Sequence, residues 1–137
     1  MYEKGEMFYT AVRSKGSQFL VLAELLDTEG DCAIVNIVSD PCDHFRDYMR
    51  EFSTRRRPKS CLFPKVEGFP HKWGEDGFDT LQEGDDVLVA RDNKIFKETI
   101  VRKTAKQART ENSLIRRSRP INFVTLPKGM ARSGRLQ

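Results

Sequence analysis

The segment EGDDVLVARDNKIFKETIVRK, residues 83–103, constrains the fold of this chain more than any other stretch of its sequence. Apolar side chains alternate on both sides of Asp92-Asn93, a pair that tolerates the positive φ of a short hairpin turn. The pattern predicts two antiparallel strands with Val87 and Val89 facing the core. The segment contains no histidine, cysteine or serine and no glycine-rich loop, so it carries no catalytic signature.

The hairpin opens on Gly84-Asp85, and its spacing GD-x-V-x-V-x-R-x2-K-x-F-x4-V resembles the first two strands of Tudor-like and other SH3-like barrels. Residues 113–127, SLIRRSRPINFVTLP, resemble the closing strands of the same class, with an Arg-rich bend before an apolar strand. The resemblance implies a mostly β to α+β fold built on small SH3-like (Tudor-like) barrel strands.

The N-terminal part of the chain also favours strands. Residues 7–13 alternate, and apolar runs at 19–26 and 32–38 flank a polar turn at 27–31. A helix over 18–29 ending at Gly30 is the alternative, and we favour strands because 32–38 offers an apolar partner across the turn. Residues 5–15 and 93–103 share a faint similarity, which would fit two barrel-like halves. We favour chance, since the similarity covers one strand.

The segment 40–53 carries the best helix pattern of the chain. Asp40 suits the N-cap position, Pro41 the first helical position, and apolar side chains follow at i, i+3, i+4 and i+7: Phe45, Tyr48, Met49 and Phe52. This pattern predicts an amphipathic helix that packs on a sheet. Residues 53–78 contain three prolines without a lasting period and are predicted to be a long irregular loop. Residues 1–126 then form one domain, and 127–137 a disordered basic tail.

The net charge of +4 conceals an asymmetry along the chain. Residues 102–137 contain ten Lys or Arg and a single acid, Glu111, a net charge of +9 that leaves −5 for residues 1–101. Three cysteines do not make a disulfide framework, and the sequence contains neither an apolar run of membrane-spanning length nor a secretory signal. These features predict an intracellular protein, cytoplasmic or nuclear, with no membrane partner, while the oligomeric state stays open.

The basic clusters point to nucleic acid as the partner, RNA rather than duplex DNA. For the first cluster, Arg55–Arg57 and Lys59, compensation of the dipole of the preceding predicted helix is an equal alternative. The candidate phosphate-binding residues are Arg55, Arg56, Arg57, Lys59, Arg102, Lys103, Lys106, Arg116, Arg117 and Arg119. In composition alone, a small basic-tailed protein without enzyme motifs also resembles viral accessory proteins such as plant-virus silencing suppressors.

Aromatic residues between the basic clusters suggest a second function. Trp73, Phe78 and Phe96 could stack unpaired bases, or line a cleft that reads a partner or host peptide, including one with methylated lysine. Packing in the core is the simpler role for most of these rings. Phosphate-driven binding weakens steeply with salt, whereas a methyl-lysine cage depends on salt much less, which separates the two functions.

Four side chains could serve as zinc ligands: Cys42, His44, Cys61 and His71. They lack the paired spacing of a zinc knuckle, and we favour a buried thiol and surface histidines, with no cofactor. The cysteines and histidines also lack the local signature of a nucleophilic enzyme. The sequence therefore predicts a non-enzymatic protein.

Overall fold

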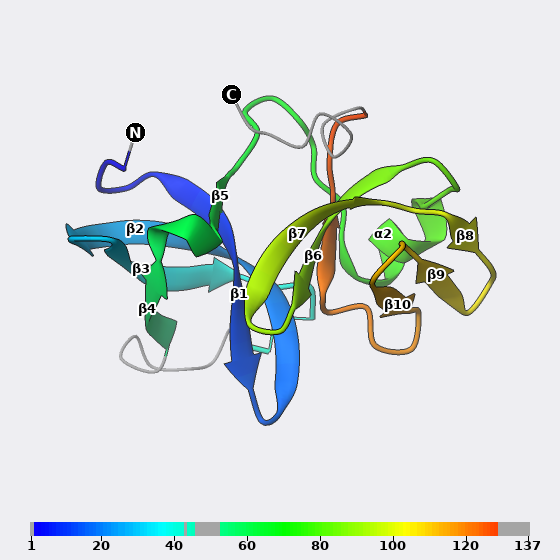
Figure 1. The fold of residues 1–137 in the computed structure, drawn as a ribbon, viewed down its shortest axis with the longest axis horizontal. Helices are drawn as coiled ribbons and strands as arrows, with labels where there is room; N and C mark the ends of the chain where they lie inside the picture. The colour runs from blue at the N-terminus through cyan, green and yellow to red at the C-terminus, as the bar shows by residue number, and fades with distance from the viewer. Residues whose placement is uncertain (1, 43, 46–52, 129–137) are drawn as a thin grey trace.

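The computed structural model describes residues 2–42, 44, 45 and 53–128, and the chain is mostly β with antiparallel sheets, as predicted. Residues 7–64, here called the first unit, contain five strands: β1 (Met7–Ser14), β2 (Ser17–Glu29), β3 (Cys32–Ser39), β4 (Thr54–Pro58) and β5 (Leu62–Pro64). A 3-10 helix, η1 (Lys59–Cys61), joins the last two. The sheet order is β4-β3-β2-β1-β5, so the fifth strand returns to the first (Figure 1).

Strand β2 is the longest of the first unit and pairs with two neighbours in succession. Its first half pairs with β1, and its second half pairs with β3 after a register shift between Leu22 and Ala23. Side chains of both faces are buried from Phe19 to Ala23, because β2 is covered on each side there. The strand prediction for this region is confirmed, and the helical alternative over 18–29 is wrong.

Residues 86–125, here called the second unit, repeat this order of pairing. They comprise β6 (Asp86–Arg91), β7 (Lys94–Thr99), β8 (Arg102–Lys103), β9 (Gln107–Arg109), β10 (Leu114–Arg116) and β11 (Phe123–Thr125). Strands β6 and β7 form the predicted hairpin, with Asp92 and Asn93 at φ 53° and 61°. The chain then passes directly from β7 to β8, which pairs with β9, and β11 returns to β6.

Each unit is therefore a meander whose bent second strand pairs with the first strand and then with the third, and whose last strand closes on the first. The sequence similarity between 5–15 and 93–103 does not follow this repeat, because it matches the first strand of one unit with the second strand of the other. The repeat lies in the pairing of the strands rather than in their residues.

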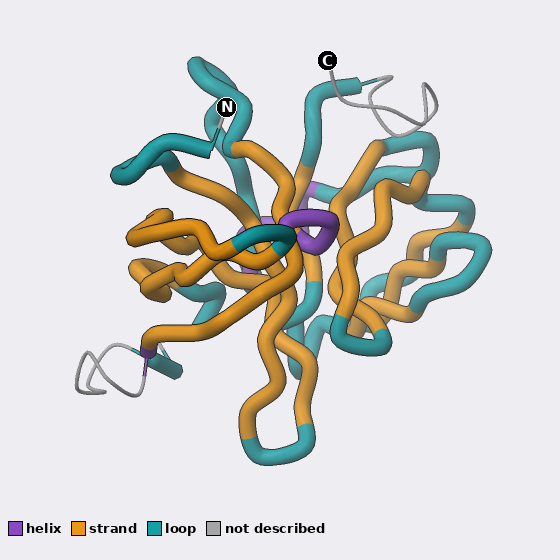
Figure 2. Tube along the Cα trace, turned by 60° about the vertical axis from the view of Figure 1, so that its left-hand side comes forward, coloured by secondary structure: helices purple, strands orange, loops and turns teal. Residues whose placement is uncertain are grey.

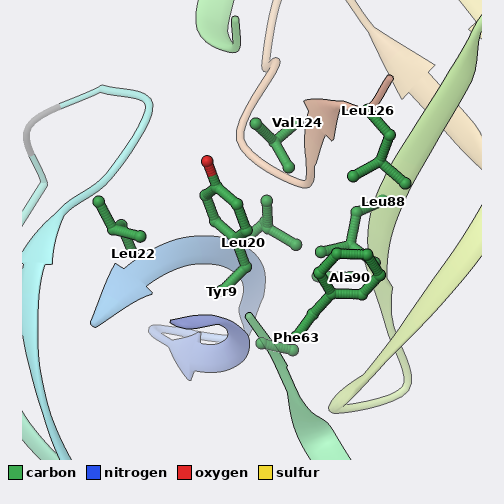
Figure 3. Close-up of a cluster of buried hydrophobic side chains, with 9 residues drawn as sticks. Tyr9, Leu20, Leu22, Phe63, Leu88, Ala90, Val124 and Leu126 are labelled. Atoms are coloured by element: carbon green, nitrogen blue, oxygen red, sulfur yellow. The ribbon is translucent and has the colours of Figure 1, made fainter. Parts of the chain in front are cut away.

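The two units pack through a common cluster of side chains, called the shared core (Figure 3). Its members come from β1, β2, β5, β6 and the region of β11: Tyr9, Ala11, Leu20, Leu22, Phe63, Leu88, Ala90, Val124 and Leu126. On β6, Leu88 and Ala90 face the shared core, while Val87 and Val89 face the interior of the second unit. The hairpin was expected to bury one face, and β6 instead buries both.

The tips of the hairpins connect the units at their surface. The Asn93 amide donates to the side-chain oxygen of Gln18, and the Arg57 guanidinium donates to the Asn93 carbonyl at 2.5 Å. The tip of the β1–β2 hairpin projects from the rest of the molecule in both views (Figure 1, Figure 2).

Residues 53–78 differ from the predicted irregular loop, because they contain β4, η1, β5 and most of the short helix α2 (Gly74–Thr80). Helix α2 covers the interior of the second unit with Phe78, which is fully buried. Gly77 lies so close to the backbone of Lys72 that a Cβ there would be 2.8 Å from its carbonyl carbon.

The predicted helix over 40–53 falls largely on residues 43 and 46–52, which lie outside the described residues, as does the predicted tail beyond Lys128. At its start the Asp40 carboxylate accepts hydrogen bonds from the amides of Cys42, His44 and Phe45 at 2.7–3.0 Å. Asp40 thus accepts hydrogen bonds from the following backbone amides, as an N-cap residue does. The described residues that follow it form turns.

Candidate nucleic-acid interface

The three short strands β8, β9 and β10 form a small sheet at one end of the molecule (Figure 1). Arg102 lies opposite Arg109, which in turn lies opposite Leu114, while Ala108 lies opposite Lys103 and Ile115. Ala108 and Ile115 are fully buried in the second unit. Because side chains alternate along a strand, Arg102, Arg109 and Arg116 point to the outer face, where all three are exposed.

We call these three side chains the arginine row. Their arrangement is electrostatically unfavourable. Like charges directly opposite each other on neighbouring strands destabilise a sheet, and Arg102 and Arg109 are such a pair. Within the described part of the chain, none of the three arginines forms an ion pair with a carboxylate. The row therefore presents positive charge that the fold itself does not neutralise.

The turn between β8 and β9 extends the positive surface. A hollow of about 590 Å³ lies beside Arg116 and is lined by Thr104, Lys106, Gln107 and Ser118. The Thr104 hydroxyl accepts hydrogen bonds from the amides of Lys106 and Gln107 at 3.3 and 3.2 Å, which fixes the turn. Lys106 is exposed, so it adds a fourth cation at the end of the arginine row.

The first predicted cluster, 55–59, lies on β4 and η1 at the opposite end of the molecule from β8–β10 (Figure 1). Arg56 forms an ion pair with Glu29, and hydrogen bonding to that carboxylate raises the pKa of Arg56. Arg57 is buried, Arg55 lies over the Phe45 ring, and Lys59 lies over the Tyr2 ring. The structure thus separates the two clusters that would have formed one basic face.

Three other predicted phosphate-binding residues, Lys103, Arg117 and Arg119, have structural partners. Arg117 forms ion pairs with Asp79 at 2.7 Å and Glu75 at 3.2 Å, and its hydrogen bond lowers the pKa of Asp79. Arg119 donates to the Ser17 hydroxyl at 2.6 Å. The Lys103 ammonium lies 4.6 Å from the centre of the Phe78 ring and donates to the Leu81 carbonyl. These cations hold α2 and the first unit in place.

The three aromatic residues predicted to line one cleft lie in different surroundings. Phe78 is fully buried, so its ring is closed to a ligand. Trp73 packs beside His71 and Tyr9 at the shared core, where the Tyr9 hydroxyl is 2.5 Å from Nδ1 of His71. Burial raises the pKa of Tyr9, and burial together with Lys65 lowers the pKa of His71, so both are neutral near pH 7.

The predicted zinc ligands are likewise dispersed. The Nε2 atom of His44 lies 3.0 Å from the Ser14 hydroxyl, and its ring stacks on Phe19, whereas His71 pairs with Tyr9. Cys61 is buried and Cys42 exposed. Among the residues described, no group of three or more His, Cys, Asp or Glu side chains is placed to hold a metal ion.

Arg109 is the functional candidate that the sequence-based prediction missed. It is isolated in the sequence, between Ala108 and Thr110, and belongs to a strand of three residues. Only its register opposite Arg102 makes it part of a charged surface.

A helix long and apolar enough to cross a membrane is absent from the described residues. Comparison of the chain with protein-family models, curated proteins and solved structures found no match.

Proposed function

We propose that this protein is a non-enzymatic nucleic-acid-binding protein that holds phosphates on the arginine row and Lys106. The observation that carries this proposal is the uncompensated charge of Arg102, Arg109 and Arg116 on one sheet face. An unfavourable arrangement of like charges is relieved when an anion binds between them. Nucleic acid supplies anions at regular spacing, which fits a row of cations better than a single site.

The proposal includes the fold class of the units. Strand β11 pairs with β6 of the hairpin that opens on Gly84-Asp85, so the two segments that resemble SH3-like barrels lie side by side, which supports this assignment. We assign both units to this SH3-like class, with Tudor-like domains as relatives, because the first unit has the same order of pairing.

The test is a salt-series titration with a short RNA, comparing the parent protein with the variant Arg102→Gln/Arg109→Gln/Arg116→Gln. Each phosphate that is no longer neutralised by a cation reduces the slope of log K against log salt by about 0.7 for a single strand or about 0.9 for a duplex. The triple variant should therefore flatten the slope by roughly 2 to 3 units. Its melting temperature should not fall, since the replaced side chains are exposed.

The matched control removes three cations from the first unit: Arg13→Gln/Lys15→Gln/Arg56→Gln. It has the same net charge as the arginine-row variant and should keep most of the parent slope. Equal flattening by both variants would show that binding follows net charge rather than this face. Failure of the parent protein to bind any nucleic acid at low salt would overturn the proposal and favour a peptide ligand.

A further inference from the structure

A second hollow, called the Val101 hollow, opens beside the arginine row at the end away from Lys106. Its volume is about 490 Å³, and its lining includes Phe96, Thr99, Val101, Glu111 and Asn112. Val101 directly precedes Arg102, and its amide donates to the Arg109 carbonyl at 2.7 Å. The hollow therefore begins where the row of cations ends.

The apolar part of this hollow is formed by Val101 and Phe96. Val101 is 53% exposed, more than any other large hydrophobic side chain that the structure describes. Beside it, Phe96 is only partly buried although it belongs to a strand that packs on β6. The two side chains leave an apolar surface in contact with water, next to a charged face.

The Phe96 ring is covered on one face by Arg91, which also lines the hollow. The Arg91 guanidinium carbon lies 4.0 Å from the ring centre, and Arg91 also forms an ion pair with Glu98 at 3.0 Å. Glu98 accepts a further hydrogen bond from the Thr110 hydroxyl at 2.5 Å. These contacts tie Phe96 to the polar side chains that line the hollow with it.

The hollow combines two apolar side chains with polar and charged ones, a mixture that suits the aromatic face and polar edges of a nucleobase. A base offers an aromatic face to Phe96 and Val101, and polar edges to Thr99, Glu111 and Asn112. In a duplex, by contrast, these faces are stacked on neighbouring bases and the edges are paired. Only an unpaired base can enter while its phosphate stays on Arg102 and Arg109.

We propose that the Val101 hollow binds an unpaired base of a single-stranded nucleic acid whose phosphates lie on the arginine row. This inference rests on the proposed function and narrows the ligand from nucleic acid in general to its single-stranded form. The strand then runs from the turn at Lys106 across the three arginines into the hollow.

The experiment measures binding of the full-length protein to three probes of RNA: a single strand of about 12 nucleotides, which is within the usual site size for single-strand binding, the same strand with abasic positions, and the duplex. The parent protein should prefer the single strand to both other probes. Phe96→Leu, which keeps an apolar side chain but removes the ring, should weaken binding of the single strand by about tenfold. It should leave the affinity for the abasic strand unchanged.

A second variant guards against loss of folding in Phe96→Leu. Val101→Ser changes an exposed side chain and should weaken binding of the single strand by about threefold. It should not change the melting temperature of the protein. Its control is Val38→Ser on β3, where the valine is 45% exposed and far from the row in sequence. Val38→Ser should bind like the parent.

The outcomes separate this inference from the function on which it rests. The base-binding role is overturned if the parent protein binds the single strand and the duplex with equal affinity. It is also overturned if both hollow variants lose as much affinity for the abasic strand as for the intact strand. If the arginine-row variant still binds all three probes more weakly than the parent in those cases, the proposal of phosphate binding stands. If the arginine-row variant weakens none of them, both proposals fall.

Discussion

At the scale of single residues, Glu98 shows how the fold holds a charge in a half-buried position. Burial is the largest single influence on its pKa and raises it, but hydrogen bonds from Thr110, Ser113 and Arg91 together hold the pKa below its ordinary value. A depressed pKa means that the ionised carboxylate stabilises the folded state. That contribution is complete above the unfolded pKa and is lost as the pH falls through the folded pKa.

This sign gives a prediction for the pH dependence of stability. In denaturant titrations from about pH 6 to about pH 3, the parent protein should lose stability more steeply than Glu98→Gln, which has no carboxylate to protonate. Glu98→Gln itself should be less stable near neutral pH, because Arg91 loses the closer of its two ionic partners and keeps only Asp92 at 3.8 Å. Glu67→Gln, at an exposed loop position, should follow the parent curve. Parallel curves for the parent and Glu98→Gln would show that Glu98 is not stabilised by its neighbours.

Residue roles were the least predictable part of the candidate site. Seven of the predicted phosphate-binding residues contact rings, carboxylates, a hydroxyl or backbone carbonyls of the protein itself: Arg55, Arg56, Arg57, Lys59, Lys103, Arg117 and Arg119. Their partners are distant in sequence, as with Asp79, which lies 38 residues from Arg117. The sequence shows that a residue is charged but does not show its partner. Only the structure could therefore distinguish Arg102 and Arg116, which form no ion pair in the described part of the chain, from Arg117, which forms two.

At the scale of elements, helix α2 is the one whose position depends most on a missing side chain. A Cβ on Gly77 would lie 2.8 Å from the carbonyl carbon and 3.1 Å from the carbonyl oxygen of Lys72. These are backbone atoms, which cannot move aside as a flexible side chain could. The helix can therefore approach residues 72–73 this closely only with glycine at this position.

Two effects oppose each other in the variant Gly77→Ala. Alanine favours a helix by about 1 kcal/mol relative to glycine, whereas overpacking against fixed atoms costs about 1–3 kcal/mol. We expect the clash to dominate, so Gly77→Ala should lower the free energy of unfolding in a denaturant titration. Asp76→Ala, at the exposed neighbouring position of the same helix, should change it by no more than about 0.5 kcal/mol. A stabilised Gly77→Ala would mean that α2 does not pack this closely.

Long alternating strands could be predicted from the sequence, as could the closing strands β10 and β11 within residues 113–127, whereas β4, β5 and β9 could not. Strands β1, β2, β3, β6 and β7 combine apolar alternation with turn residues, and all were found where strands were predicted, although β2 (Ser17–Glu29) extends beyond the predicted 19–26 at both ends. Strand β4, with the sequence TRRRP, contains no apolar side chain besides proline, and β5 has three residues. Both are strands because β3 and β1 offer unpaired edges. That information lies in the partner strand, so residues 53–64 were predicted to be irregular.

At the scale of the whole molecule, the shared core joins the two units more tightly than their separate sheets suggest. Tyr9 and Leu20 of the first unit pack in the same cluster as Leu88 and Val124 of the second (Figure 3). Separating the units would expose these side chains to water. The stability of each unit therefore includes a contribution from the other.

We expect this joint core to give one cooperative unfolding transition. Fluorescence of Trp73, the single tryptophan, and far-UV circular dichroism should yield coincident melting curves. Leu88→Ala should shift both curves together and cost about 2–5 kcal/mol. Val38→Ala, at an exposed position of β3, should leave them close to the parent. Two separate transitions, only one of which moves in Leu88→Ala, would show that the units fold independently.

The position of β11 has a consequence for the order of events during synthesis. The first unit has all its strands once residue 64 has left the ribosome, yet Tyr9, Leu20 and Leu22 still lack the partners that β6 and β11 supply. Val124 and Leu126 complete that cluster only after another 60 residues have emerged. During this interval the nascent first unit presents an apolar face to the solvent, the kind of surface that chaperones bind and that leads to aggregation when release is delayed.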